Sequence, residues 1–258
     1  MVFKTVHISR TLNVRRTTIL ILMNVVLFFG VFTGDVAGQK RFSRTYPATK
    51  NVRLQLLNRS GMIEVQGWDR QEISISAYLE APAASVVPQS LSGTIILDLV
   101  RENQGRSVGN VNFQIRVPRT SVVDIETLIG NLSVTNISGG LVRAVVTSEG
   151  DITLTNIVAS AVDAQNGIGD IFFDGEMRSG GHYRFTSMKG SINLRIPFES
   201  SFRVVATAPS TRNIDLGPFQ GANMRFFKDG RRVTGQAGEG AATLTVTNQR
   251  GNIAFLRR

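Results

Sequence analysis

The chain has 258 residues, contains no cysteine and carries a formal charge of +10. The lack of cysteine excludes disulfides, thiol nucleophiles and zinc or redox sites that need cysteine. Residues 1–44 hold seven of the basic residues and one acid, Asp35, which leaves 22 basic and 18 acidic residues elsewhere, a net charge of +4. So small an excess does not indicate a nucleic-acid partner, which needs clustered lysine and arginine.

Residues 1–38 have the features of an export signal. A basic start is followed by an apolar run of 14 residues, Ile19–Phe32, which is short for a membrane span and typical of a signal peptide. Val36-Ala37-Gly38 offers small residues for cleavage. We predict a cleaved signal peptide, with an uncleaved N-terminal anchor as the alternative. The protein is therefore expected in the periplasm, on the cell surface or secreted, with no membrane contact beyond this segment.

Residues 39–127 are predicted to form an irregular β region that caps the N-terminal side of the fold. Alternation of apolar and polar residues predicts strands at Val52–Leu57, Met62–Val65, Ile73–Tyr78, Thr94–Val100 and Asn112–Val117. A loop is expected between the third and fourth of these strands. No stretch after residue 38 has the sustained 3.6-residue period of an amphipathic helix.

Residues 128–258 contain an internal repeat, in which glycine is followed by a polar residue, Ile or Leu, any residue and an apolar residue. The regular copies begin at Gly130, Gly150, Gly169 and Gly190, in steps of 20, 19 and 21 residues, and a further copy begins at Gly251. Arg212–Leu216 is a degenerate copy without the glycine, and Gly61–Val65 is an early outlier. Repeats of this length indicate stacked units that share a continuous core.

Each repeat unit has the pattern of two short strands joined by a polar turn. Apolar residues recur five and seven positions before each glycine, with Val145 expected inside and Arg143 as the one exception. We predict an all-β, single-domain β-solenoid with coils of about 20 residues, paired in parallel. The alternative is an antiparallel β-sandwich, which also has short strands and regular turns. Lys228–Arg231 predicts a hairpin inserted between two coils, followed by a glycine-rich loop at Gly235–Gly240.

Three segments resemble a known family. "FQIRVPRTSVVDIETLIGNLSV" (Phe113–Val134), "SEGDITL" and "MKGSINLRIP" look like the bacterial "putative adhesin" domain family of unknown function. The resemblance extends over about residues 45–258 and is best over 112–200. It implies an exported β-solenoid or β-roll, and it implies no activity.

Two acids are candidates for chemistry. Asp151 and Asp170 follow the glycine in consecutive units, so they are expected to stack about 5 Å apart. Paired carboxylates can hydrolyse glycosides or bind calcium. However, the equivalent positions of other units hold Asn131, Ser191 and Asn252, which favours turn formation. We therefore predict no catalytic, cofactor-binding or metal-binding residue.

The remaining candidates are a histidine and three aromatic residues. His182 is the single histidine after the export segment, and no Gly-x-Ser-x-Gly motif accompanies it, so a surface or turn position is expected. Trp68, Phe226 and Phe227 could form an aromatic contact patch, but core packing is the preferred interpretation.

These observations predict a non-enzymatic, exported cell-envelope protein with an adhesin-like binding or scaffolding surface. Its partner is expected to be an envelope or extracellular protein or polysaccharide. The alternative is a carbohydrate-active β-helix enzyme, a glycoside hydrolase or lyase. Such enzymes usually carry long loops around a groove, whereas the loops between the repeat units are short.

The alternation also predicts which side chains face inward. Ile152 and Ile171 should be stacked neighbours in the interior, whereas Thr153 and Phe172 on the same strands should face outward. A register shifted by one residue would exchange these faces.

Overall fold

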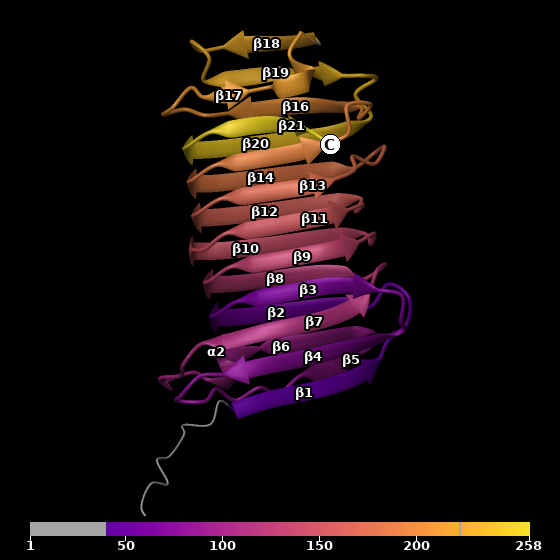
Figure 1. Cartoon of the computed structure of the whole chain (residues 1–258), viewed down its shortest axis with the longest axis vertical. Helices are drawn as coiled ribbons and strands as arrows, with labels where there is room; N and C mark the ends of the chain where they lie inside the picture. Colours follow the sequence, from indigo (N-terminus) through magenta and orange to yellow (C-terminus); the bar gives the residue numbers. More distant parts are fainter. Residues whose placement is uncertain (1–39, 222) are drawn as a thin grey trace, which may run out of the picture. The chain divides into compact units, whose positions relative to one another are not determined.

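The computed structural model describes residues 40–221 and 223–258, so the predicted signal peptide lies outside the described residues. The described chain forms two facing sheets (Figure 1). In spatial order, sheet A contains β1 (Lys40–Pro47), β4 (Glu72–Leu79), β7 (Val111–Pro118), β3 (Ile63–Trp68), β9 (Leu132–Ile137), β11 (Ile152–Ile157), β13 (Ile171–Gly175), β15 (Ile192–Ile196), β21 (Ile253–Arg257) and β17 (Ile214–Asp215).

Sheet B faces sheet A across the core. In spatial order, it contains β18 (Asn223–Phe227), β19 (Arg232–Ala237), β16 (Phe202–Thr207), β20 (Ala242–Arg250), β14 (His182–Lys189), β12 (Ala161–Ile168), β10 (Leu141–Glu149), β8 (Val122–Ile129), β2 (Arg53–Ser60), β6 (Thr94–Asp98) and β5 (Gln89–Leu91). In the part of the chain that the structure describes, helical structure is limited to α2 (Leu99–Glu102) and the short 3₁₀ helix η1 (Gly217–Phe219). In the described ranges, no helix is long and apolar enough to cross a bilayer.

The central strands form a solenoid. Each coil consists of one strand of sheet B, a turn with glycine and one strand of sheet A, and successive coils pair in parallel in both sheets. The predicted solenoid is confirmed, and the antiparallel sandwich is wrong for this central part because its neighbouring strands are parallel. Inward side chains stack in columns, one of which contains Leu132, Ile152, Ile171, Ile192 and Ile253, all buried.

The predicted faces of this column are confirmed. Ile152 and Ile171 are in register on β11 and β13 and are both fully buried. Thr153 and Phe172 are half-buried and lie on the outer face of sheet A. Period-2 alternation therefore gives the correct register in these two coils.

Strand β10 contains one irregularity that cannot be predicted by counting residues back from the turn glycine. Its register against β8 and β12 shifts between Val146 and Glu149, which indicates a β-bulge. Because of the extra residue, Ala144 rather than Val145 is the inward partner of Ile125. Arg143 therefore faces outward like the equivalent residues of neighbouring coils. The bulge explains why a polar residue stands seven positions before Gly150, where the other units have an apolar one.

The turn glycines allow neighbouring coils to approach closely. Gly150 has a φ of +146°, and a Cβ atom there would lie 2.2 Å from the carbonyl oxygen of Gly130. Any other residue would both strain the backbone and collide with the preceding coil. A buried asparagine supports the turn, since Nδ2 of Asn166 donates to the carbonyl of Gly150 at 2.8 Å.

The order of coils in space departs from chain order at both ends. The segment predicted as an early outlier is a regular coil, because Ile63 on β3 is in register with Leu132 on β9. The chain then leaves this coil and returns on its other side, where β7 pairs with β3. At the opposite end, Ile253 on β21 lies between Ile192 on β15 and Ile214 on β17. The degenerate copy predicted around Ile214 thus continues the column of inward side chains.

Antiparallel strands close both ends of the stack. Strands β4 and β1 extend sheet A beyond β7 at the end that contains the N-terminal residues of the described chain, and β19 and β18 extend sheet B beyond β16 at the other (Figure 1). The predicted hairpin is confirmed, with Lys228, Asp229 and Gly230 at positive φ between β18 and β19. The loop predicted from Gly235 begins later, because residues 235–237 belong to β19.

The inward position of Ile152 gives a direct test of the register. Ile152→Asp would place a charge in a column of aliphatic side chains, at a cost of at least about 3 kcal/mol. A domain is stable by only about 5–15 kcal/mol, so soluble folded protein should be lost. Thr153→Asp, on the outer face, should change stability by no more than about 0.5 kcal/mol. Circular dichroism melts of the two variants measure the difference, and greater damage from Thr153→Asp would contradict the structure.

Candidate functional surface

The predicted acids Asp151 and Asp170 hold neighbouring coils together. The backbone N–H of Asp170 donates to Oδ1 of Asp151 at 2.8 Å, and the N–H of Ser191 donates to Oδ1 of Asp170 at 2.7 Å. Oδ1 of Asn131 accepts from the N–H of Asp151 in the same way, at 3.0 Å. A carboxylate is therefore not needed at these positions, since an amide oxygen makes the same contact. This geometry supports the turn interpretation over calcium binding or glycoside hydrolysis.

Metal binding has little support elsewhere in the described ranges. No group of three or more His, Asp or Glu side chains there is arranged to hold an ion. His182 is exposed at the start of β14, as expected for a surface histidine.

The aromatic residues do not form one patch. Trp68 is half-buried at the end of β3, and its indole N–H donates to the carbonyl of Glu72 at 2.8 Å. Phe226 and Phe227 lie on the edge strand β18, at the opposite end of the stack, and are 52% and 47% exposed. The preferred prediction of core packing is wrong for these two phenylalanines, because β18 is an edge strand of sheet B and both side chains are about half exposed.

The outer face of sheet B carries a row of alternating charges. Asp124, Arg143, Asp163 and Arg184 occupy equivalent positions on β8, β10, β12 and β14. Neighbouring strands in a sheet lie about 4.8 Å apart, so each charge is adjacent to one of opposite sign. The bulge in β10 hides this row from sequence analysis, because Arg143 is one position farther from its glycine than the other three residues are from theirs.

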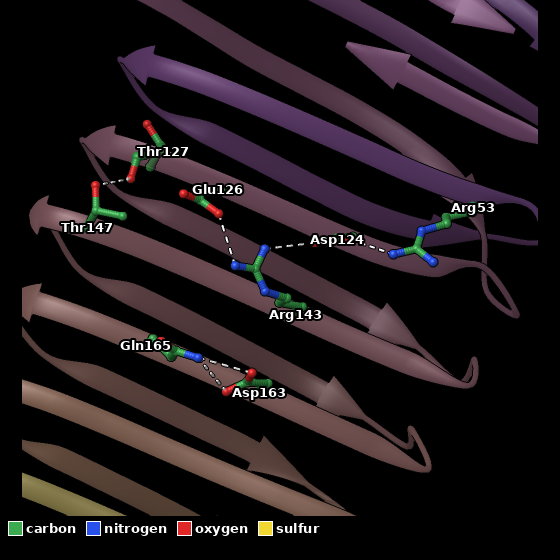
Figure 2. A network of polar contacts seen from close by, with 8 residues as sticks. All are labelled: Arg53, Asp124, Glu126, Thr127, Arg143, Thr147, Asp163 and Gln165. Atoms are coloured by element: carbon green, nitrogen blue, oxygen red, sulfur yellow. Dashed lines mark hydrogen bonds and ion pairs between the residues drawn. The ribbon is translucent and has the colours of Figure 1, made fainter. Parts of the chain in front are cut away.

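One half of the row forms a connected network (Figure 2). Arg143 donates to Asp124 at 3.0 Å and to Glu126 at 2.9 Å, and Arg53 donates to the other oxygen of Asp124 at 2.6 Å. The Asp124 side chain is only 10% exposed, so these two arginines compensate a largely buried charge. Partial burial opposes the charge of Arg143, but the hydrogen bonds from its guanidinium to Glu126 and Asp124 outweigh burial and raise its pKa.

The other half of the row lacks such partners. Asp163 accepts two hydrogen bonds from the neighbouring Gln165, both of 3.1 Å. In residues 40–221 and 223–258, neither Asp163, Arg184 nor His182 takes part in an ion pair. These three side chains line a shallow, open hollow of about 290 Å³ together with Thr243 and Thr245. The hollow presents a carboxylate, a guanidinium, an imidazole and two hydroxyls to the solvent.

A second hollow lies on the outer face of sheet A. It measures about 270 Å³, and its polar lining residues are Glu64, Gln66, Ser74, Ser76, Gln114 and Arg116. It lies on the antiparallel part of the sheet, formed by β4 and β7, and on the adjoining β3. Both hollows are open depressions with hydrogen-bonding groups, which suits contact with a polar surface.

The role of Asp151 can be tested by replacing its carboxylate. Asp151→Asn keeps an oxygen acceptor for the N–H of Asp170, so the melting temperature should stay close to that of the wild type. Asp151→Ala removes the acceptor and should cost about 0.5–1.5 kcal/mol. Neither EDTA nor calcium should shift the wild-type melt in a thermal unfolding assay. The opposite result would be a large loss of stability in EDTA that added calcium reverses. If Asp151→Asn also removed this effect of EDTA, Asp151 would be a calcium ligand.

Comparison with solved structures supports the solenoid fold. The chain is similar to a "putative cell adhesion protein" from Clostridium sporogenes, with a TM-score of 0.51, 10% identity, and coverage of 86% of this chain and 100% of that chain. A "putative adhesin" from Bacteroides fragilis matches with a TM-score of 0.31 at 12% identity, over 86% and 98% of the two chains. A "putative lipid binding protein" from Parabacteroides distasonis matches with a TM-score of 0.33 at 8% identity, over 85% and 97%.

The first of these similarities concerns the fold alone, since its identity is only 10%. No curated protein is similar enough in sequence to count as a match. The model of the family described as Toastrack DUF4097 matches residues 52–255, which include every coil of the stack. The resemblance to the "putative adhesin" domain family is thereby confirmed, and the chain belongs to the Toastrack DUF4097 family.

Proposed function

We propose that this protein is an exported, non-enzymatic protein of the cell envelope that binds a polar partner through the outer face of sheet B. Export is supported by the basic start, the apolar run Ile19–Phe32 and the small residues before residue 39. The name of one structurally similar protein, a "putative cell adhesion protein", agrees with a binding role. The partner is an envelope or extracellular protein or polysaccharide.

The observation that carries the proposal is the difference between the two halves of the charge row. Asp124 and Arg143 neutralise each other within the network, whereas Asp163 and Arg184 remain available beside an open hollow. The strands beneath are paired on both sides, so the side chains are presented from a rigid surface. Such preorganised polar groups bind with a smaller loss of conformational entropy than groups on a loose loop.

A carbohydrate-active enzyme is less well supported. Glycoside hydrolysis needs a pair of carboxyl groups on either side of the scissile bond. Asp151 and Asp170 use their Oδ1 atoms to accept backbone N–H groups, so the best pair predicted from the sequence serves the turns. The hollow on sheet B has Asp163 as its one lining acid. It therefore lacks the second carboxyl group that glycoside hydrolysis needs, and it is better suited to binding.

Export can be tested by sequencing the N-terminus of the protein recovered from the cell envelope or the culture medium. Cleavage after Gly38 should give a chain that begins near Gln39. Replacement of the apolar residues Val25 and Leu27 by Asp should keep the precursor in the cytoplasm, since a signal peptide needs an apolar core. Recovery of intact Met1 from the envelope would contradict cleavage and support the anchor.

The binding face can be tested with the double variant Asp163→Ala/Arg184→Ala. We expect it to lose capture of the wild-type partner from solubilised envelope proteins or purified envelope polysaccharide, because it removes both unpaired charges. The matched control is Gln66→Ala/Gln114→Ala on the outer face of sheet A, which should retain capture. Both variants should stay within about 0.5 kcal/mol of wild-type stability per site, as measured by thermal melts. Equal capture by all three proteins would contradict the proposed face.

A further inference from the structure

The β18–β19 hairpin forms the end of the stack that lies opposite β1, at the top of Figure 1. In sheet A the last described strand at this end is β17, which belongs to the same coil as β16. Sheet B continues beyond β16 through β19 and β18. The hairpin therefore projects past the last coil, and no described strand of sheet A faces it.

Two large aromatic side chains lie on opposite faces of β18. Phe226 pairs with Val233, which in turn pairs with the buried Ala206, so Phe226 is on the inner face of sheet B. Phe227 is the next residue along the strand, so it is on the outer face, where it pairs with Arg232. Both rings are about half exposed. The hairpin thus presents apolar surface to the solvent on both of its faces.

The same hairpin is basic. Between residues 223 and 232 it has four basic residues and one acid, a net charge of +3: Arg225, Lys228, Arg231, Arg232 and Asp229. All five side chains are exposed. Within residues 40–221 and 223–258, none of the five takes part in an ion pair. These cations are therefore available to an anionic partner.

The other charged residues at this end do not cancel the positive charge. From residue 198 to residue 240 there are six basic and four acidic residues, a net charge of +2. Asp215 on β17 lies near Arg212 in the chain, and its Oδ1 accepts from the N–H of Gly217 at 2.8 Å. Glu199 precedes β16 and Glu239 follows β19, and these two strand ends lie side by side. They are separated from the hairpin turn by the length of β19, about 20 Å, which is more than a Debye length.

Exposed phenylalanines among cations fit the surface of an anionic membrane. Aromatic rings enter the boundary between the lipid headgroups and the acyl chains, while lysine and arginine side chains extend to the headgroup phosphates. A bilayer surrounds a projecting hairpin and covers both faces of the strand, whereas a flat protein surface covers only one. A second copy of this chain is disfavoured, because pairing along β18 would bring two hairpins of charge +3 together.

We propose that the β18–β19 hairpin docks this protein on a lipid surface with anionic headgroups, with Phe226 and Phe227 inserted among the lipids. The proposal replaces the expectation of no membrane contact beyond the export segment. It goes beyond the binding face on sheet B and leaves that face free. Arg184 on β14 is four strands away from β18, which corresponds to about 19 Å.

Sedimentation with lipid vesicles tests the docking. Residues 39–258 form one compact unit that contains the whole hydrophobic core, so the protein can be used without the apolar run of the export segment. It should bind vesicles made of equal parts phosphatidylcholine and phosphatidylglycerol, and it should bind pure phosphatidylcholine at least about tenfold more weakly. Phe226→Ser/Phe227→Ser and Lys228→Gln/Arg231→Gln should each weaken binding to the anionic vesicles by about tenfold or more.

Two control variants should bind the anionic vesicles as the wild type does. Val87→Ser/Leu91→Ser removes two exposed apolar side chains at the opposite end of the stack. Asp163→Ala/Arg184→Ala removes the charges of the binding face, so its result separates this proposal from the proposed function. All four double variants should melt close to the wild-type temperature, because the replaced side chains are on the surface.

A tryptophan at the hairpin reports insertion directly. Trp68 is the single tryptophan of the chain and lies at the opposite end of the stack. In Phe227→Trp, lipids with brominated acyl chains should quench the new tryptophan. The same lipids should leave the emission of Trp68 in the wild-type protein unchanged.

Three results would overturn the proposal. The first is a wild-type protein that does not bind the anionic vesicles. The second is a loss of binding in Val87→Ser/Leu91→Ser but not in Phe226→Ser/Phe227→Ser, which would assign the contact to the other end of the stack. The third is binding that needs Lys228 and Arg231 but neither phenylalanine, without quenching of Phe227→Trp, which would indicate an acidic polymer as the ligand.

Discussion

The close approach of successive coils at the turn glycines is the constraint on which the rest of the structure depends. At Gly251, an added Cβ would lie only 1.6 Å from the carbonyl oxygen of Gly190, so even one methyl group would separate the coils. Without side chains at this column, the backbones come near enough for hydrogen bonds in both sheets. Those bonds fix the register from coil to coil, and the register in turn aligns every inward and outward row of side chains.

The same register shapes the surface. Charges that are about 20 residues apart in sequence become neighbours, as Asp124 and Arg143 do at 3.0 Å. A residue added to one strand would normally exchange its inner and outer faces, but the bulge in β10 absorbs the extra residue and returns Glu149 to register. The outer face of sheet B thus keeps an uninterrupted row, of which one part is neutralised internally and the adjacent part, Asp163 and Arg184, forms no ion pair in the described ranges.

The middle of the fold could be predicted from the sequence, because each coil there repeats the same local pattern next to its chain neighbours. Ile152 and Ile171 belong to this part. The ends could not be predicted, since the local pattern around Ile253 does not reveal that its coil lies inside the coil of Ile214. The core position predicted for Phe226 and Phe227 is wrong for a similar reason: their local sequence gives no sign that β18 lies at the edge of a sheet. The charge row cannot be predicted from the repeat, because the bulge places Arg143 one residue farther from its turn glycine than the equivalent residues of the other coils.

The inverted coil order at both ends has a consequence for how the stack can change in length. The coils β2–β3 and β20–β21 are each held between two neighbours; antiparallel strands lie beyond β7 in sheet A at one end and beyond β16 in sheet B at the other, where sheet A ends in the parallel strand β17. New repeats appended near either end of the chain would therefore meet antiparallel strands in at least one of the two sheets. An inserted coil would find parallel neighbours on both sides in both sheets among the central coils, between β8 and β15. The ends therefore limit the length of the stack, and coils are most readily added by insertion in its central part.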